Sequence, residues 1–138
     1  IEYLEERYPA PPLWGVDARA RARARELERI AELRVLAPIA RYIHATRSPL
    51  GLPPDPAQAE QAQAAWPAGL GYLDTVLSDG RAFVCGAQPT VADCTLAAAL
   101  QFARFAEVAL ALEHDYPALA RWDRDYRARP AAGAVLTL

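Results

Sequence analysis

Hydrophobic residues recur along most of the chain at the three- and four-residue spacing of amphipathic helices, which predicts an all-α fold. The clearest case is a helix over residues 57–78, in which four large apolar side chains share one face: Trp66, Leu70, Leu73 and Leu77. Pro67 and two nearby glycines interrupt this stretch and predict a kink or a break near Trp66.

A second long helix is expected from Asp17 to about Thr46. Asp17 is a favourable N-cap, and the alanines and arginines that follow it are strong helix formers. Pro38 lies inside this helix, where it removes one backbone hydrogen bond and should bend the axis. Residues 1–8 predict a short amphipathic helix, which the proline-rich segment 9–12 ends as a stiff connector.

The sharpest local signal is the segment Thr90-Val-Ala-Asp93. A threonine at the N-cap with an acid three residues later predicts a capping box, in which each side chain bonds to the other's backbone N–H. The alanine-rich run from Cys94 to about Ala106 follows, and few of its positions are expected to face water. This run is therefore predicted to be the central helix of the core.

The end of the chain predicts one more amphipathic helix. Asp115 is the expected N-cap, and the helix should end at Arg129, before a proline. Residues 131–138 add a short terminal turn. With four or five helices and no convincing strand, the predicted fold is a helical bundle around the helix that follows Thr90.

Composition narrows the class of protein. The 138 residues are 53 % hydrophobic and 23 % charged, which fits one globular domain. A net charge of −2 gives no basic field for nucleic acid, and no run approaches the roughly 20 apolar residues that span a bilayer. We therefore expect no nucleic-acid partner and no membrane partner. All 15 basic residues are arginine, a bias typical of high-GC bacterial genomes, and the missing initiator Met predicts that the chain begins inside a longer protein.

The two cysteines are too few for a disulfide framework, which predicts a reduced, cytoplasmic setting. Cys94 is expected to be a small buried residue, whereas Cys85 lies in a loop and should be more exposed. With His44 and His114 they form none of the usual metal-ligand spacings, so neither a metal site nor a catalytic thiol is expected.

The order of these signals resembles the cytosolic glutathione transferases. A helix end with Tyr3-Leu-Glu-Glu-Arg-Tyr-Pro9, a proline linker and a long helix precede Gly86 and the segment Pro89-Thr-Val-Ala-Asp93. The resemblance covers essentially the whole chain, and the Thr-Val-Ala-Asp box is its most specific element. It implies that residues 1–12 are the end of a thioredoxin-like N-terminal domain with its linker, and that residues 13–138 are an all-helical C-terminal domain.

The resemblance also implies a function. In that family the upstream domain binds glutathione and carries the residue that activates its thiol, so no catalytic residue is expected in this chain. The helical domain would supply the pocket for a small hydrophobic electrophile and much of the surface of a homodimer, in a protein of detoxification with glutathione as co-substrate. Conjugation, isomerisation, dehalogenation and reduction all stay open.

Candidate site residues follow from the same resemblance. The family usually lines its electrophile pocket near the C-terminal end of the long helix, which here contains Arg34, Arg41, Tyr42 and His44. The alternative is that Tyr42 is a core aromatic and His44 a surface residue. Thr90 and Asp93 are expected to serve the fold and not catalysis.

Two other functions are compatible with the sequence. One is a non-catalytic protein-interaction module, because the same fold also serves in assemblies that bind partner proteins. The other is a free-standing helical ligand-binding domain, which the missing Met and the uncapped first turn disfavour. Four arginines at alternate positions from Arg19 to Arg25 are expected to form a solvated, salt-bridged face or dimer contacts, and Trp14 and Trp66 to be interface or core anchors.

Overall fold

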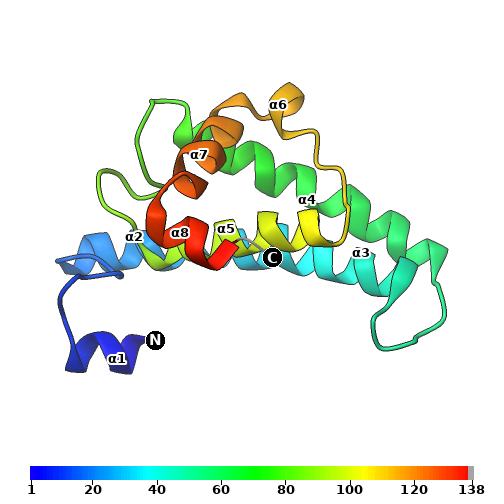
Figure 1. Ribbon diagram of the computed structural model, residues 1–138, viewed down its shortest axis with the longest axis horizontal. Coiled ribbons are helices and arrows are strands. Elements are labelled where there is room, and N and C mark those ends of the chain that lie inside the picture. The colour runs from blue at the N-terminus through cyan, green and yellow to red at the C-terminus, as the bar shows by residue number, and fades with distance from the viewer. Residues whose placement is uncertain (137–138) are drawn as a thin grey trace.

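The computed structural model describes residues 1–136, which form a bundle of helices (Figure 1). The elements are α1 (Glu2–Arg7), α2 (Ala18–Ala31), the π-helical turn η1 (Glu32–Leu36), α3 (Ala37–Arg47), α4 (Pro56–Leu77), α5 (Val91–Phe105), α6 (Leu112–Asp115), α7 (Pro117–Arg127) and α8 (Pro130–Leu136). Within these residues the only strand-like feature is an isolated bridge between Phe83 and Gly86. The predicted all-α class is confirmed, although the helices are shorter and more numerous than expected.

The long helix predicted to start at Asp17 is present in three consecutive pieces, α2, η1 and α3. The Asp17 carboxylate accepts a hydrogen bond from the Ala20 N–H at 2.8 Å, as an N-cap does. In η1 the Ala37 N–H bonds to the Glu32 carbonyl, five residues back. This wider turn comes directly before Pro38, whose ring would collide with the carbonyl four residues earlier in a regular α-helix. The predicted disturbance at Pro38 thus takes the form of a π-helical turn.

A kink or a break was predicted near Trp66; helix α4 is continuous through Pro67, so the break is wrong. Its apolar stripe is buried as predicted, with Leu70, Leu73 and Leu77 fully so. Gly69 has a packing role, because a Cβ at this position would lie 2.5 Å from the carbonyl oxygen of Arg34 in η1. The glycine lets two helices approach closely, and this contact offsets its low helix propensity.

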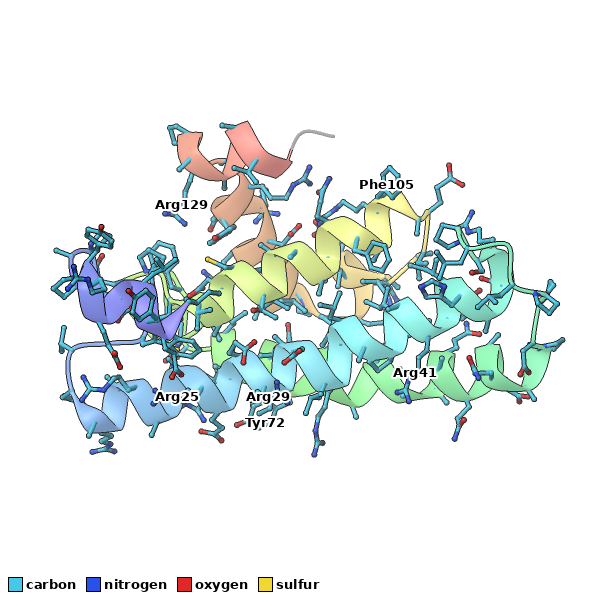
Figure 2. The ribbon with its side chains drawn as sticks, turned by 90° about the horizontal axis from the view of Figure 1, so that it is seen from below. Arg25, Arg29, Arg41, Tyr72, Phe105 and Arg129 are labelled. Atoms are coloured by element: carbon cyan, nitrogen blue, oxygen red, sulfur yellow. The ribbon has the colours of Figure 1, made fainter. Side chains whose placement is uncertain are left out.

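Helix α5 lies alongside α2 in the core (Figures 1 and 2). Eight of its residues are buried, among them Leu96 and Leu100. One stripe nevertheless faces solvent, because Cys94, Ala98 and Phe105 share a helical face that the described elements leave uncovered. Phe105 is 72 % exposed, so its predicted place in the core is wrong.

The C-terminal helices differ most from the expected pattern. Asp115 ends the short helix α6 and does not cap α7. The cap comes instead from Asp74 on α4, whose carboxylate accepts a hydrogen bond from the Leu119 N–H at 2.9 Å. Helix α7 ends at Arg127, and α8 provides the predicted terminal turn, of which residues 137–138 lie outside the described part of the chain.

Helix α1 stands apart from the bundle and is tied to it through the linker (Figure 1). None of its residues is buried. The Glu5 carboxylate accepts hydrogen bonds from the N–H groups of Leu13 at 2.9 Å and Trp14 at 3.1 Å, which fixes the linker against the helix. None of the helices within residues 1–136 is both long enough and apolar enough to cross a lipid bilayer.

Candidate ligand-binding site

The start of α5 is held by a capping box at Thr90 and Asp93. Asp93 is completely buried. Its Oδ2 accepts hydrogen bonds from the Thr90 N–H at 2.8 Å and the Thr90 hydroxyl at 3.0 Å. Its Oδ1 accepts from the Val84 N–H at 2.8 Å and from Nε1–H of Trp122 at 3.1 Å. A single carboxylate therefore joins α5, the loop before it and α7.

The environment of Asp93 explains its structural role. Burial raises the pKa of the Asp93 carboxyl above its ordinary value, while the hydrogen bonds from Val84, Thr90 and Trp122 oppose the rise because they favour the ionised form. Both carboxylate oxygens are occupied by donors from the protein itself. The group is therefore committed to the fold and is not arranged to act on a substrate.

Aromatic side chains pack closely beside this carboxylate. Trp122 stacks on Tyr126 with ring centroids 5.1 Å apart. The Arg129 guanidinium lies 4.9 Å from the Tyr126 ring and 5.0 Å from the Phe83 ring, and Figure 2 shows Arg129 near the junction of α7 and α8. Burial raises the pKa of Tyr126 to about 12. At this end of the bundle the Trp122, Tyr126 and Phe83 rings and the Arg129 guanidinium therefore pack against one another.

A cavity of about 390 Å³ opens beside the other end of α5, between α3, α4 and the loop after α5. We call it the Tyr42 cavity, and its lining residues are Tyr42, Thr46, Arg47, Gln63, Trp66, Glu107, Val108 and Ala109. The rings of Tyr42 and Trp66 meet edge to face, with centroids 5.3 Å apart and planes at 89°. Two helices thus supply an aromatic wall, which suits an apolar ligand.

Two opposite charges stand at the Tyr42 cavity. Nη1 of Arg47 lies 3.4 Å from Oε2 of Glu107, and their side chains are 51 % and 83 % exposed. Glu107 follows the last turn of α5 with a left-handed φ of 54°. The Glu107 N–H bonds to the Arg104 carbonyl and the Val108 N–H bonds to the Ala103 carbonyl. These bonds form a Schellman cap, in which glycine usually takes the left-handed position.

The four predicted pocket residues do not gather at one place. Tyr42 lines the Tyr42 cavity, whereas Arg34, Arg41 and His44 are absent from its lining. Arg34 and Arg41 are exposed, and Nδ1 of His44 lies 3.0 Å from the hydroxyl oxygen of Ser48. Successive residues of a helix point about 100° apart, so neighbours of Tyr42 in sequence face other directions.

The structure adds residues that the sequence did not indicate as site residues. Trp66 belongs to the apolar stripe of α4, so its pattern predicts a core residue, and only 6 % of its surface is exposed. Arg47 and Glu107 are separated by 60 residues, and no local pattern links them. A glutamate directly after an alanine-rich helix, where glycine is usual, is the one local signal that could have drawn attention to Glu107.

The exposure of the two cysteines is the reverse of what the sequence predicted. Cys94 is exposed and Cys85 is partly buried, so the predicted burial of Cys94 is wrong. Position 94 falls on the solvent-facing stripe of α5. Burial raises the pKa of the Cys85 thiol, which disfavours the reactive thiolate. Within residues 1–136 no group of three or more His, Cys, Asp or Glu side chains is arranged to hold a metal ion.

A larger hollow, of about 540 Å³, lies between α1, the linker and α2. Three of its charged residues are already engaged, because Arg25 pairs with Glu2 at 2.8 Å and lies over the ring of Trp14, and Glu5 accepts hydrogen bonds from the linker. The Tyr42 cavity is the better candidate, because its two charged residues meet only in an exposed pair at 3.4 Å and the half-buried Tyr42 ring lies on its wall.

Known proteins with the same arrangement of helices identify the family. The profile of the family described as glutathione S-transferase, C-terminal domain, matches residues 56–122. No curated protein matches the chain. Among solved structures, the chain is similar to Gtt2 from Saccharomyces cerevisiae, with a TM-score of 0.84 and 27 % identity over 96 % of this chain and 64 % of that one.

Two bacterial structures give the same result. A glutathione S-transferase from Rhodospirillum rubrum F11 has a TM-score of 0.79 and 31 % identity over 99 % of this chain and 62 % of that one. A glutathione S-transferase from Methylobacillus flagellatus KT, solved with GSH bound, has a TM-score of 0.82 and 25 % identity over 96 % and 64 %. The chain spans less than two thirds of the length of these proteins. It belongs to the glutathione S-transferase family, of which it holds the C-terminal helical domain.

Proposed function

We propose that this chain forms the electrophile-binding half of a glutathione transferase, and that a small hydrophobic electrophile binds in the Tyr42 cavity. The observation that carries the proposal is the aromatic wall of Tyr42 and Trp66 beside a cavity of about 390 Å³. Aromatic and apolar walls remove an apolar ligand from water, and the few polar groups around them fix its orientation. Thr46 and Gln63 are the uncharged polar residues in this position.

Glutathione would be the co-substrate, bound mainly by residues that are not in this chain. In this proposal residues 1–12 end a thioredoxin-like domain and residues 13–138 form the helical domain. The exposed apolar side chains of α1 support the division, since Tyr3 and Leu4 are 70 % and 57 % exposed and would pack against the rest of such a domain. Similarity to a transferase solved with GSH bound supports the choice of co-substrate.

The chemistry divides between the two parts. A thiol with an ordinary pKa of about 8.5 is mostly protonated near neutral pH, and only its thiolate is a strong nucleophile. The thioredoxin-like part would stabilise that thiolate, and the helical domain would hold the electrophile within reach, which raises the rate by fixing their relative position. We further propose a cytoplasmic homodimer. The contacts predicted for Arg34, Arg41 and His44 stay predictions, since none of the three lines the Tyr42 cavity.

The first test is a calorimetric titration of glutathione into the product of the whole open reading frame that contains this chain. The 138-residue chain serves as the comparison. Binding to the long product with little heat from the chain alone is the expected result. If the long product does not bind glutathione, a partner-binding module becomes the better account.

A second test addresses the cavity. Ala109 lies exposed on its lining, so Ala109→Trp should fill the cavity without disturbing the core. In the long product this substitution should raise KM for an aromatic electrophile and leave glutathione affinity unchanged. Ala131→Trp, at an exposed position of α8, is the matched control. Equal KM values for both variants would place the electrophile elsewhere.

A further inference from the structure

We propose that the ligand of the Tyr42 cavity carries an anionic group such as a carboxylate, and that Arg47 recognises this group at the edge of the cavity. The inference rests on the proposed function, because it names the chemical class of ligand for the same cavity. It adds Arg47 as a residue that determines specificity.

The first support is the unused capacity of Arg47. A guanidinium offers five N–H donors in a planar fork that matches a carboxylate. Within residues 1–136, its one polar contact is the single 3.4 Å approach to Glu107. An exposed pair at that distance holds the two side chains weakly. Arg47 is therefore free to exchange one carboxylate for another.

The second support is the backbone of Glu107. Its left-handed φ of 54° is unfavourable for a residue with a Cβ, and glycine would avoid this strain. Strained residues of this kind gather at functional sites, where other requirements outweigh the cost. The strained position places a carboxylate next to Arg47 at the Tyr42 cavity. Glu107 thus occupies the place that a ligand carboxylate would take.

The third support is the difference in exposure between the two charges. Arg47 is 51 % exposed and Glu107 is 83 % exposed. When a ligand carboxylate pairs with Arg47, the Glu107 side chain becomes fully solvated at little cost in free energy. A cationic ligand would instead have to pair with Glu107, the more exposed of the two side chains, where water competes more strongly for the ion pair. The cavity therefore favours an aromatic or apolar body with one negative charge.

Three probes of the same shape test the proposal. They are naphthoate, naphthamide and naphthylmethylammonium, which are negative, neutral and positive. Affinities are measured with the 138-residue chain from the change in tryptophan fluorescence. Naphthoate should bind about threefold to fivefold tighter than naphthamide, the effect of one exposed ion pair of up to about 1 kcal/mol, and the cation should bind most weakly.

Variants assign the preference to Arg47. Arg47→Gln should remove the difference between naphthoate and naphthamide while leaving naphthamide unchanged, and Glu107→Gln should tighten naphthoate alone. Arg124→Gln replaces an exposed arginine of α7 and is the matched control. It should leave the affinities of all three probes unchanged. Raising the salt concentration should shrink the preference for naphthoate in the wild-type chain and have no effect in Arg47→Gln.

The outcomes separate the two proposals. If the three probes bind with equal affinity and Ala109→Trp abolishes their binding, the role of Arg47 is overturned, and the cavity remains the site of an apolar ligand. Tighter binding of the cation would overturn the anionic class in the same way. If Ala109→Trp leaves the affinities unchanged, or if no probe binds, the proposal that the Tyr42 cavity is the ligand site is overturned.

Discussion

The two ends of helix α5 are completed in opposite ways. At the N-terminal end, the buried Asp93 carboxylate satisfies four donors from three parts of the chain. At the C-terminal end, Glu107 caps the helix in a left-handed conformation and reaches one weak, exposed ion pair. The first end concentrates stabilising contacts, and the second tolerates strain beside a cavity. The comparison teaches that the two ends of one helix can be completed by different means, and on the proposal above the second end serves a ligand.

The largest expected effect lies at the capped end. Asp93→Ala leaves the Val84 N–H and the Trp122 indole N–H buried without partners and breaks the capping box. Unsatisfied buried donors cost about 1 to 3 kcal/mol each, so we expect a loss of about 3 to 5 kcal/mol in the free energy of unfolding. Denaturation in urea measures it. A loss below about 1 kcal/mol would show that Asp93 is not the central contact of this end.

The middle of the bundle connects the two ends and gives a matched pair of substitutions. Gly69→Ala puts a Cβ 2.5 Å from the Arg34 carbonyl, so α4 must move away from η1, and we expect a loss of about 1 to 3 kcal/mol. At Gly71 the nearest atom to a new Cβ is 3.9 Å away, in Tyr116. Gly71→Ala should therefore stabilise the protein by up to about 1 kcal/mol through helix propensity. Equal changes in Tm for the two variants would refute the close contact.

At the C-terminal end of α5, a substitution is expected to raise the stability of the fold. Glu107→Gly removes the cost of the left-handed conformation and should stabilise the fold by about 1 kcal/mol, which thermal unfolding can measure. Glu107→Gln keeps the strain and loses only the exposed pair, so its Tm should stay close to that of the wild type. If glycine destabilises the chain more than glutamine does, the strain argument for Glu107 is wrong.

The smallest effect appears only in alkali. Burial raises the pKa of Tyr126 to about 12 in the folded protein, against about 10 in the unfolded chain. The folded state therefore holds the phenolic proton more tightly, and stability falls as pH rises from about 10 through about 12. Phenolate absorbance of the wild type and Tyr126→Phe should differ by one group with a midpoint near 12. A difference with its midpoint near 10, the ordinary tyrosine value, would contradict the packing around Trp122.

Local signals in the sequence predicted those parts of the fold that depend on neighbouring residues. The N-cap at Asp17, the Thr90 to Asp93 box and the buried stripe from Trp66 each rest on spacings within one helix. The cap of α7 could not be predicted in this way, because Asp74 lies 45 residues from Leu119.

The candidate site was predicted less well than the fold. The resemblance placed a pocket near the end of the long helix, and of the predicted residues Tyr42 lines a cavity there, whereas helical geometry directs Arg34 and Arg41 elsewhere. Arg47, Trp66 and Glu107 meet only after α3, α4 and the loop after α5 have packed together. Exposure of Cys94 and Phe105 likewise depends on which elements cover α5, and composition alone does not contain that information.

The most direct test of the account is amide chemical-shift mapping of the 138-residue chain with naphthoate. The account predicts shifts at Tyr42, the Trp66 indole and Ala109, with the amides of Val84 and Thr90 unchanged. Shifts centred on Val84 and Thr90, or on the hollow beside α1, would contradict the claim that the ligand site lies at the C-terminal end of α5.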